Sequence, residues 1–160
     1  MGKLHMKRIA LTGAVLLSSL LSFTATAAEL SPEEQAAQAV ANRQAVFKLL
    51  SFSNAPLGVM ARGGEFNQEA AITAIERIAV LGGMIPALFE TNTVGKGIDS
   101  RAADTIWNAK ADFDQLAADL VTAANEAKAT IESQGAAGVA GAVRSIGPKC
   151  GACHDRFRLD

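Results

Sequence analysis

Apolar residues recur along most of this 160-residue chain at intervals of three and four, which is the period of an α-helix. A first helix is predicted from Ser31 to about Phe52. Its start carries Pro32 at the first helical position and Glu34, which reaches back to cap the backbone as in a capping box. A loop over residues 53–66 should follow. The predicted helix has one common face, formed by Val40, Arg43, Phe47 and Leu50.

A second helix is predicted to begin near Asn67, and Gly82-Gly83 and Pro86 should weaken or bend its last turns. A loop over 90–99 leads to the longest helix, which should start at Asp99 or Ser100. The inner positions of these two helices are Ile72, Ile75, Ile78 and Ala79, and then Ile106, Ala109, Phe113, Leu116, Leu120 and Ala123.

A break over residues 133–135 separates this helix from a fourth, which Gly147-Pro148 should interrupt just before the cysteines. No stretch shows the sustained alternation of apolar and polar residues that a half-buried strand would need. Four amphipathic helices with short connections predict an all-α fold, an antiparallel four-helix bundle.

The N-terminal residues have the layout of a secretory signal peptide. A basic head (Lys3, Lys7 and Arg8) precedes the uncharged apolar run 9–23, and small residues follow, so cleavage is expected after Ala27 or Ala28. The run is shorter than the roughly 20 apolar residues of a membrane-spanning helix, so a retained anchor is the less favoured alternative. Residues 1–28 are therefore predicted to be a signal peptide, and residues 29–160 a periplasmic domain without a further membrane segment.

Removing that segment changes the charge balance and the histidine count. The whole chain has 15 Lys+Arg, 16 Asp+Glu and 2 His. Without the basic head, 12 cations stand against 16 acids, a formal charge of −4. No clustered basic face indicates a nucleic-acid partner. The only histidine left is His154.

The sequence Cys150-Gly-Ala-Cys153-His154 matches the attachment motif of a c-type haem. On a helix the two thiols lie about one turn apart and can add to the two vinyl groups of the porphyrin. His154, four residues after Cys150, lies on the same face and can bind the iron. The motif therefore predicts one covalent haem c per chain, held by Cys150 and Cys153, with His154 as the metal ligand.

Three other uses of these residues are weaker. A Cys150–Cys153 disulfide would close a very short loop and stabilise little. A thioredoxin-like redox pair needs a βαβ context that a helical chain lacks. A structural zinc site needs four ligands of the cysteine or histidine type, and residues 29–160 offer three.

The position of the motif near the C-terminus of a helical bundle resembles cytochrome c′, the class II c-type cytochromes of bacterial periplasms. The resemblance covers essentially all of residues 29–160. It extends to residues 43–48 on the first helix, 81–89 at the end of the second, Ile106-Trp107 with Phe113 on the third, and Gly147 and Phe157-Arg158 around the motif.

The resemblance implies roles for four further residues. Arg43 and Gln44 would contact the haem, Arg43 through a propionate, because a buried charge needs a partner. Phe47 would lie over the free face of the iron, where a phenyl ring cannot be a ligand. Arg158 would lie on the side of His154. The resemblance also implies a homodimer packed through the first two helices.

These expectations lead to one functional hypothesis with one alternative. The chain should be a periplasmic cytochrome with five-coordinate, high-spin iron that transfers electrons, binds NO or CO, or does both. An enzyme is not expected, and no catalytic residue is predicted, because the pocket offers no acid–base group. The alternative is a six-coordinate, low-spin electron carrier whose second ligand is Met60, in the predicted loop, or Met84, which is expected to pack in the core.

Overall fold

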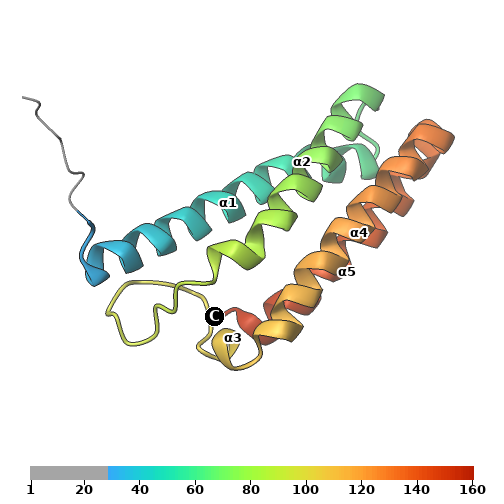
Figure 1. Cartoon of the computed structure of the whole chain (residues 1–160). Coiled ribbons are helices and arrows are strands. Elements are labelled where there is room, and N and C mark those ends of the chain that lie inside the picture. The colour runs from blue at the N-terminus through green and yellow to red at the C-terminus, as the bar shows by residue number, and fades with distance from the viewer. Residues whose placement is uncertain (1–28) are drawn as a thin grey trace, which may run out of the picture.

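The computed structural model describes residues 29–160, so the predicted signal segment 1–28 lies outside the described part. Four long helices lie side by side as two antiparallel pairs (Figure 1), which confirms the all-α four-helix bundle. A short helix precedes the third of them, and a 3₁₀ turn joins the last two. The elements are α1 (Pro32–Ala61), α2 (Gln68–Leu88), α3 (Thr105–Asn108), α4 (Lys110–Gln134), η1 (Gly135–Gly138) and α5 (Val139–Phe157).

The first helix begins at its predicted cap, and the second begins close to the predicted start near Asn67. Ser31 Oγ accepts from the N–H of Glu34 at 3.2 Å, and the Glu34 carboxylate accepts from the N–H of Ser31 at 2.8 Å. Asn67 caps α2 by accepting from the N–H of Ala70 at 2.9 Å. Each cap binds backbone N–H groups that have no partner inside the helix, which stabilises the helix start by about 1 kcal/mol.

The end of the first helix was predicted wrongly. Helix α1 continues past Phe52 to Ala61, with Pro56 in its interior. Proline removes one backbone hydrogen bond, but Pro56 lies on the exposed side of the helix, where water can bind the freed carbonyl of Phe52. Ser53 and Leu57 on the other side are buried at 3% and 0% exposure. Packing of that side holds the helix together across the proline.

The third helix was predicted to start about five residues too early. The segment that leaves the 90–99 loop pairs instead with the C-terminus of the chain: Ala103 N–H donates to Phe157 O at 3.0 Å, and Leu159 N–H donates to Arg101 O at 2.8 Å. Helix α3 starts only at Thr105, and a break at Ala109 precedes α4. The predicted inner positions are nonetheless buried or partly buried.

The predicted interruption of the last helix is also absent. Helix α5 runs without a break from Val139 through Gly147 and Pro148 to Phe157. Pro148 and Arg144, whose carbonyl it leaves without a backbone donor, are both exposed to water. The motif cysteines therefore stand on a continuous helix.

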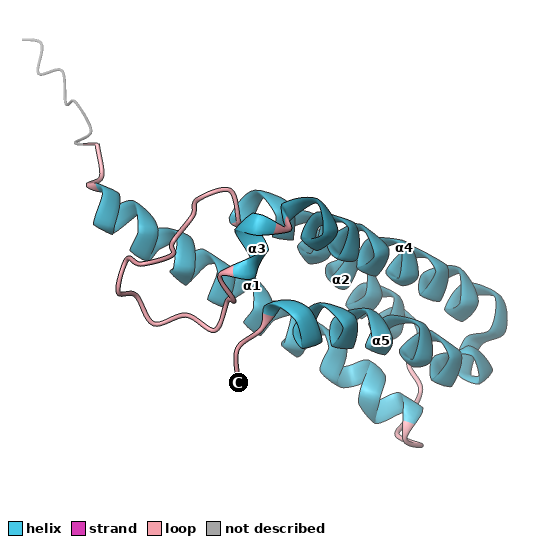
Figure 2. Cartoon of the chain, turned by 90° about the horizontal axis from the view of Figure 1, so that it is seen from below, coloured by secondary structure: helices cyan, strands magenta, loops and turns pink. Residues whose placement is uncertain are grey.

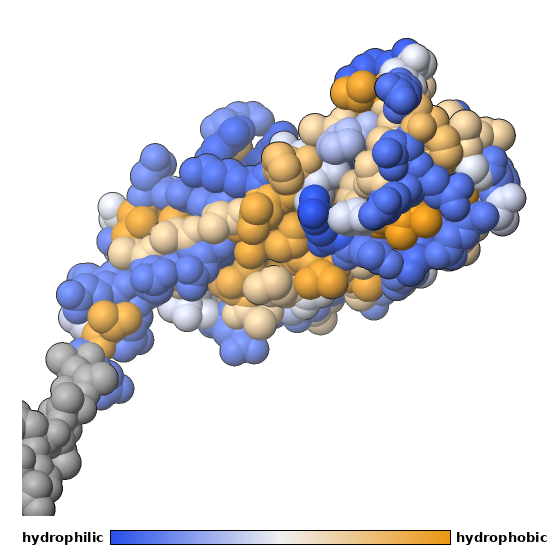
Figure 3. Space-filling model, turned by 90° about the horizontal axis from the view of Figure 1, so that it is seen from above, coloured by the Kyte–Doolittle hydropathy of each residue, from blue (hydrophilic) through white to orange (hydrophobic). Residues whose placement is uncertain are grey.

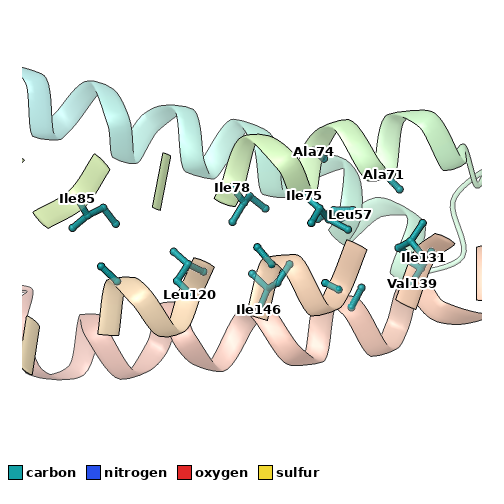
Figure 4. Packing of buried hydrophobic residues seen from close by; sticks show 14 of the residues in the cluster. Leu57, Ala71, Ala74, Ile75, Ile78, Ile85, Leu120, Ile131, Val139 and Ile146 are labelled. Carbon is teal, nitrogen blue, oxygen red and sulfur yellow. The ribbon is translucent and has the colours of Figure 1, made fainter. Parts of the chain in front are cut away.

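Side chains from all four long helices form one apolar cluster along the axis of the bundle. Figure 4 shows Leu57, Ile75, Ile78, Ile131 and Ile146 meeting between the helix pairs. Arg43 and Ser53 are the two buried polar residues in the described part of the chain.

Helix α2 is apolar on more than the face that it packs. Over an 18-residue window its mean hydropathy is 1.5, and among the described helices it alone is long and apolar enough to cross a membrane. A core helix of a soluble protein can have the same length and composition, so the expectation of no further membrane segment stays a prediction. α2 packs against α1 and α4 inside the bundle, yet only a third of that window is buried. Part of its apolar surface is left exposed.

Candidate functional site

The motif residues lie on one side of α5, against the apolar cluster. Cys150 and Cys153 are partly buried and pack onto cluster residues, and His154 is partly buried beside them. Burial raises the pKa of both thiols, because a thiolate loses hydration there. Both cysteines are free, so a disulfide between them is not formed. In residues 29–160 no three His, Cys, Asp or Glu side chains gather in a group that could hold a metal ion.

His154 has a defined neighbour on the next turn. Arg158 Nη1 lies 3.0 Å from His154 Nδ1, and an arginine can only donate, so this contact makes Nδ1 the acceptor. Burial, and next the charge of Arg158, lower the pKa of His154 and favour the neutral ring that a metal requires. Nε2 is then the nitrogen free of this contact. The structure thus brings the predicted pair together.

Five aromatic rings join the motif helix to the first helix across the bundle. Phe47 on α1 meets Phe89 with ring centroids 6.3 Å apart, Phe89 lies 4.7 Å from Phe113, and Phe113 lies 5.4 Å from Phe157. Trp107 lies 6.2 Å from Phe89 and donates from Nε1 to its carbonyl at 3.0 Å. Phe157 is three residues after His154. Phe47 and the motif therefore stand at the same end of the bundle, which we call the motif end.

Phe89 is the residue that sequence reasoning missed. It follows α2 directly, is 3% exposed, and touches three of the other four rings. Its position at the end of an apolar helix was the one available signal. The local sequence does not indicate that Phe47, 42 residues earlier, and Phe113, 24 residues later, pack against Phe89.

Arg43 is neither on the surface nor beside a carboxylate. Its side chain is 3% exposed, and its guanidinium donates to Leu88 O at 2.8 Å, to Thr93 Oγ1 at 2.9 Å and to Thr91 O. Burial lowers the pKa of Arg43. Gln44, by contrast, is exposed, and its Nε2 donates to Asp99 O at 3.4 Å. Both side chains bind the connection that follows α2.

The two methionines stand elsewhere than expected. Met60 lies in α1 rather than in the predicted loop, so the first helix does carry a methionine. It is 13 residues beyond Phe47, which places it about 20 Å along the helix from that ring. Met84 is 45% exposed on α2 rather than packed in the core. Met60 is thus far from Phe47 along α1, and much of the Met84 side chain faces solvent.

The donor set and its surroundings fit a covalently bound haem. Two neutral thiols and an imidazole share one face of a helix, and aromatic and aliphatic side chains adjoin them. A buried cation lies next to the aromatic rings and has donors to spare for a haem carboxylate. A helical bundle with these groups on its last helix defines the class of c-type cytochromes.

The family model for cytochrome c′ matches residues 38–158. The chain is 32% identical to cytochrome c′ of Rhodopseudomonas palustris over 120 residues, which are 74% of this chain and 80% of that protein. The solved structure of the R. palustris protein superposes with a TM-score of 0.71, covering 76% of this chain and 96% of that one. Another solved cytochrome c′, described as having an unusual ligand-controlled dimer dissociation, is 25% identical with a TM-score of 0.70, covering 83% and 100%.

The chain belongs to the cytochrome c′ family. It is accordingly a c-type cytochrome of electron transfer with covalently bound haem c, to which Cys150 and Cys153 fit as attachment residues. The family indicates an electron carrier or a gas-binding protein rather than an enzyme.

Proposed function

We propose that this chain is an exported, periplasmic electron carrier that holds one haem c and keeps one face of the iron open to NO and CO. In this proposal Cys150 and Cys153 form the thioether bonds and His154 binds the iron. The haem supplies an iron centre that gains and loses one electron. The observation that carries the proposal is that both thiols and the imidazole share one side of α5, against the apolar cluster.

The proposal that one face of the iron is open is supported by the residues opposite the motif. Phe47 projects from α1 toward Phe89 and has no atom that can donate to iron. Because Met60 lies about 20 Å along α1 from Phe47 and Met84 is 45% exposed on α2, the described residues favour a five-coordinate site over one with a methionine ligand. A five-coordinate, high-spin iron behind an apolar ring admits small uncharged ligands against steric resistance.

Two measurements on the purified protein test this proposal. After acid–acetone extraction the haem should stay with the polypeptide, and replacing both Cys150 and Cys153 by Ala should leave any residual haem extractable. The ferrous spectrum should be broad and high-spin, and CO should sharpen it. Haem in the organic phase of the wild-type sample would refute attachment. A low-spin spectrum with a methionine–iron signature would instead favour the six-coordinate carrier.

Export is the part of the proposal that concerns residues 1–28. Small residues stand at the −3 and −1 positions only for cleavage after Ala27 or Ala28. N-terminal sequencing of the haem-loaded protein should therefore begin at Ala28 or Glu29. A haem-loaded protein that begins at Met1 would contradict export with cleavage.

The proposal includes a homodimer formed through the outer face of α1 and α2. Five of the eight exposed large apolar side chains in the described residues lie on these two helices, and Figure 3 shows a continuous apolar band over that side of the bundle. A hollow of about 340 Å³ lies between α1 and α2 beside Phe52, Pro56 and Ala70, where it could receive a side chain of the second copy. A contiguous apolar patch of this kind marks an interaction surface. The five side chains are Leu49, Phe52, Val59, Val80 and Met84.

A charge on this face should dissociate the dimer. In an isologous contact each substitution appears twice, so Val80→Glu places two carboxylates in one apolar interface. Sedimentation of the haem-loaded protein should show a dimer for the wild type and a monomer for Val80→Glu. Val94→Glu, at an exposed valine of the 90–99 loop, is the matched control and should leave the dimer intact. A wild-type protein that sediments as a monomer would remove the dimer from the proposal.

A further inference from the structure

The guanidinium of Arg43 is a buried cation for which the protein supplies neutral oxygens rather than an acid. Its acceptors are the carbonyls of Leu88 and Thr91 and the hydroxyl of Thr93, all in or just after the last turn of α2. It also lies over the ring of Phe89, 4.4 Å from the centroid, and 5.3 Å from that of Trp107. The C-terminal carbonyls of a helix and the faces of aromatic rings are both partly negative, so together they offset the buried charge.

Gln44, the next residue of α1, binds the far end of the same connection through Asp99 O. Consecutive side chains of one helix thus contact both ends of the segment 88–99, which Figure 2 shows as a long loop beside α1. Between those ends the segment makes few bonds of its own: Val94 N–H donates to Asn92 Oδ1, and Lys96 N–H donates to Thr93 O at 3.3 Å. Most of its side chains are exposed.

We infer that Arg43 is a positioning residue which, assisted by Gln44, fastens the segment 88–99 to α1 and thereby holds Phe89 and Trp107 in place at the motif end. This role rests on the proposed function only in taking the motif end as the haem site. It differs from binding a haem carboxylate, and the two are compatible. A guanidinium has five N–H groups, and the protein uses three of them, so two stay free for a carboxylate.

The two roles respond differently to a lysine at this position. Arg43→Lys keeps the positive charge that a haem carboxylate would need, but a single ammonium cannot reproduce the planar fork that binds Leu88, Thr91 and Thr93 together. If Arg43 fastens the segment, lysine should not rescue it. If Arg43 acts only through a carboxylate of the haem, lysine should rescue most of its effect.

Hydrogen exchange of the full haem-loaded protein, read in peptides that cover residues 90–98, measures the fastening directly. The amides of Glu90, Val94 and Lys96 are the ones with hydrogen-bond acceptors in this segment. With the guanidinium removed, we expect Arg43→Lys to raise exchange at these amides by about ten-fold or more, because the segment that carries them loses several bonds to α1 together. Lys48→Ala, at an exposed position on the next turn of α1, is the control and should exchange as the wild type does.

A second pair of variants tests the same contact from the loop and leaves the charge of Arg43 in place. Thr93→Val removes the hydroxyl that accepts from Arg43 Nη1 and should raise exchange over 90–98 several-fold, whereas Thr93→Ser keeps the hydroxyl and should match the wild type. The reduction potential should change little in either. This pair decides the question even if Arg43→Lys does not fold.

The inference is overturned if exchange over 90–98 is unchanged in Thr93→Val, and likewise in Arg43→Lys where that variant folds. A shift in reduction potential with unchanged exchange would assign Arg43 to the haem carboxylate alone. A protein that carries no covalent haem would refute the proposed function, yet exchange in the same set of full-length variants would still show whether Arg43 fastens the segment.

Discussion

The two ends of the bundle are built from different side chains. At the motif end large rings fill the space between the helices, and the long connection between Phe89 and α3 closes the fold. At the opposite end, which we call the alanine end, the buried residues are small or aliphatic, and the short turn η1 joins α4 to α5 (Figure 4). The buried residues of the alanine end include Leu57, Ala71, Ala74, Ala127, Ile131 and Val139.

Because of this difference we regard the alanine end as the structural scaffold and the motif end as the functional site. Small side chains let helix backbones approach closely, and close-packed cores tolerate little change of volume. At the motif end the contacts come from rings, a buried arginine and a loop held by side chains. We therefore expect substitutions at the alanine end to affect stability and those at the motif end to affect ligand binding.

The largest expected effect is the loss of a core side chain at the alanine end. Ile131 is fully buried, so Ile131→Ala should lower the free energy of unfolding by about 2–5 kcal/mol through lost burial and the cavity left behind. Phe47→Ala at the motif end should cost less, because Phe47 is only partly buried. Thermal unfolding followed by circular dichroism compares the two, and an equal or larger loss for Phe47→Ala would break the comparison.

The second-largest expected effect is the loss of stability from overpacking at the alanine end. A Cβ added at Gly138 would lie 2.8 Å from the carbonyl oxygen of Thr130 and 3.1 Å from its methyl group. Gly138→Ala should therefore destabilise the protein by about 1–3 kcal/mol as η1 and α4 move apart. Gly141→Ala is the control, since its nearest atom, the same methyl group, would lie at 4.0 Å. Equal melting temperatures for the two variants would show that this turn is not tightly packed.

At the motif end the sensitive measurement is ligand binding. Removing the ring of Phe47 should open the free face of the iron in the proposed site. Phe47→Ala should therefore raise the CO association rate several-fold or more, equivalent to about 1 kcal/mol in the barrier. Flash photolysis of the ferrous CO complex measures this rate. Lys48→Ala, at the exposed position next to Phe47, is the control. An unchanged rate in Phe47→Ala would mean that the ring does not restrict access to the iron.

The smallest expected effect concerns two neighbouring glycines of α2. It tests whether α2 and α4 are still in close contact at this distance from the alanine end. A Cβ at Gly83 would meet nothing within 4 Å, so Gly83→Ala should stabilise α2 by about 0.5–1 kcal/mol. At the adjacent Gly82 the added Cβ would lie 3.3 Å from Val121 and 3.4 Å from Leu120, so Gly82→Ala should gain less or lose stability. If thermal unfolding shows the same gain for both, α2 and α4 are not in tight contact at this point.

Features set by neighbouring residues were predicted well from the sequence. The capping box at Ser31, the start of α2 near Asn67 and the break after α4 depend on side chains within a few positions of the backbone they bind. The spacing of Cys150, Cys153 and His154 is likewise a property of one helix, so their common face followed without a tertiary structure.

Features set by distant residues were predicted badly. The segment before α3 is extended because it pairs with backbone 54 to 58 residues further along the chain. Helices α1 and α5 pass through Pro56 and Pro148 because each proline faces water while the opposite side of the helix packs. Local propensity predicts a break at both prolines, and burial of distant partners overrides it.

The sequence by itself therefore determined the number of long helices, the starts of the first two and the one helix that presents a haem-binding motif, because these depend on contacts within a few residues. Only the tertiary structure decided where α1 and α3 begin or end, which rings face the motif, and what binds the charge of Arg43. The partners of Arg43 lie 45 to 50 residues away, and folding alone brings them within hydrogen-bond distance.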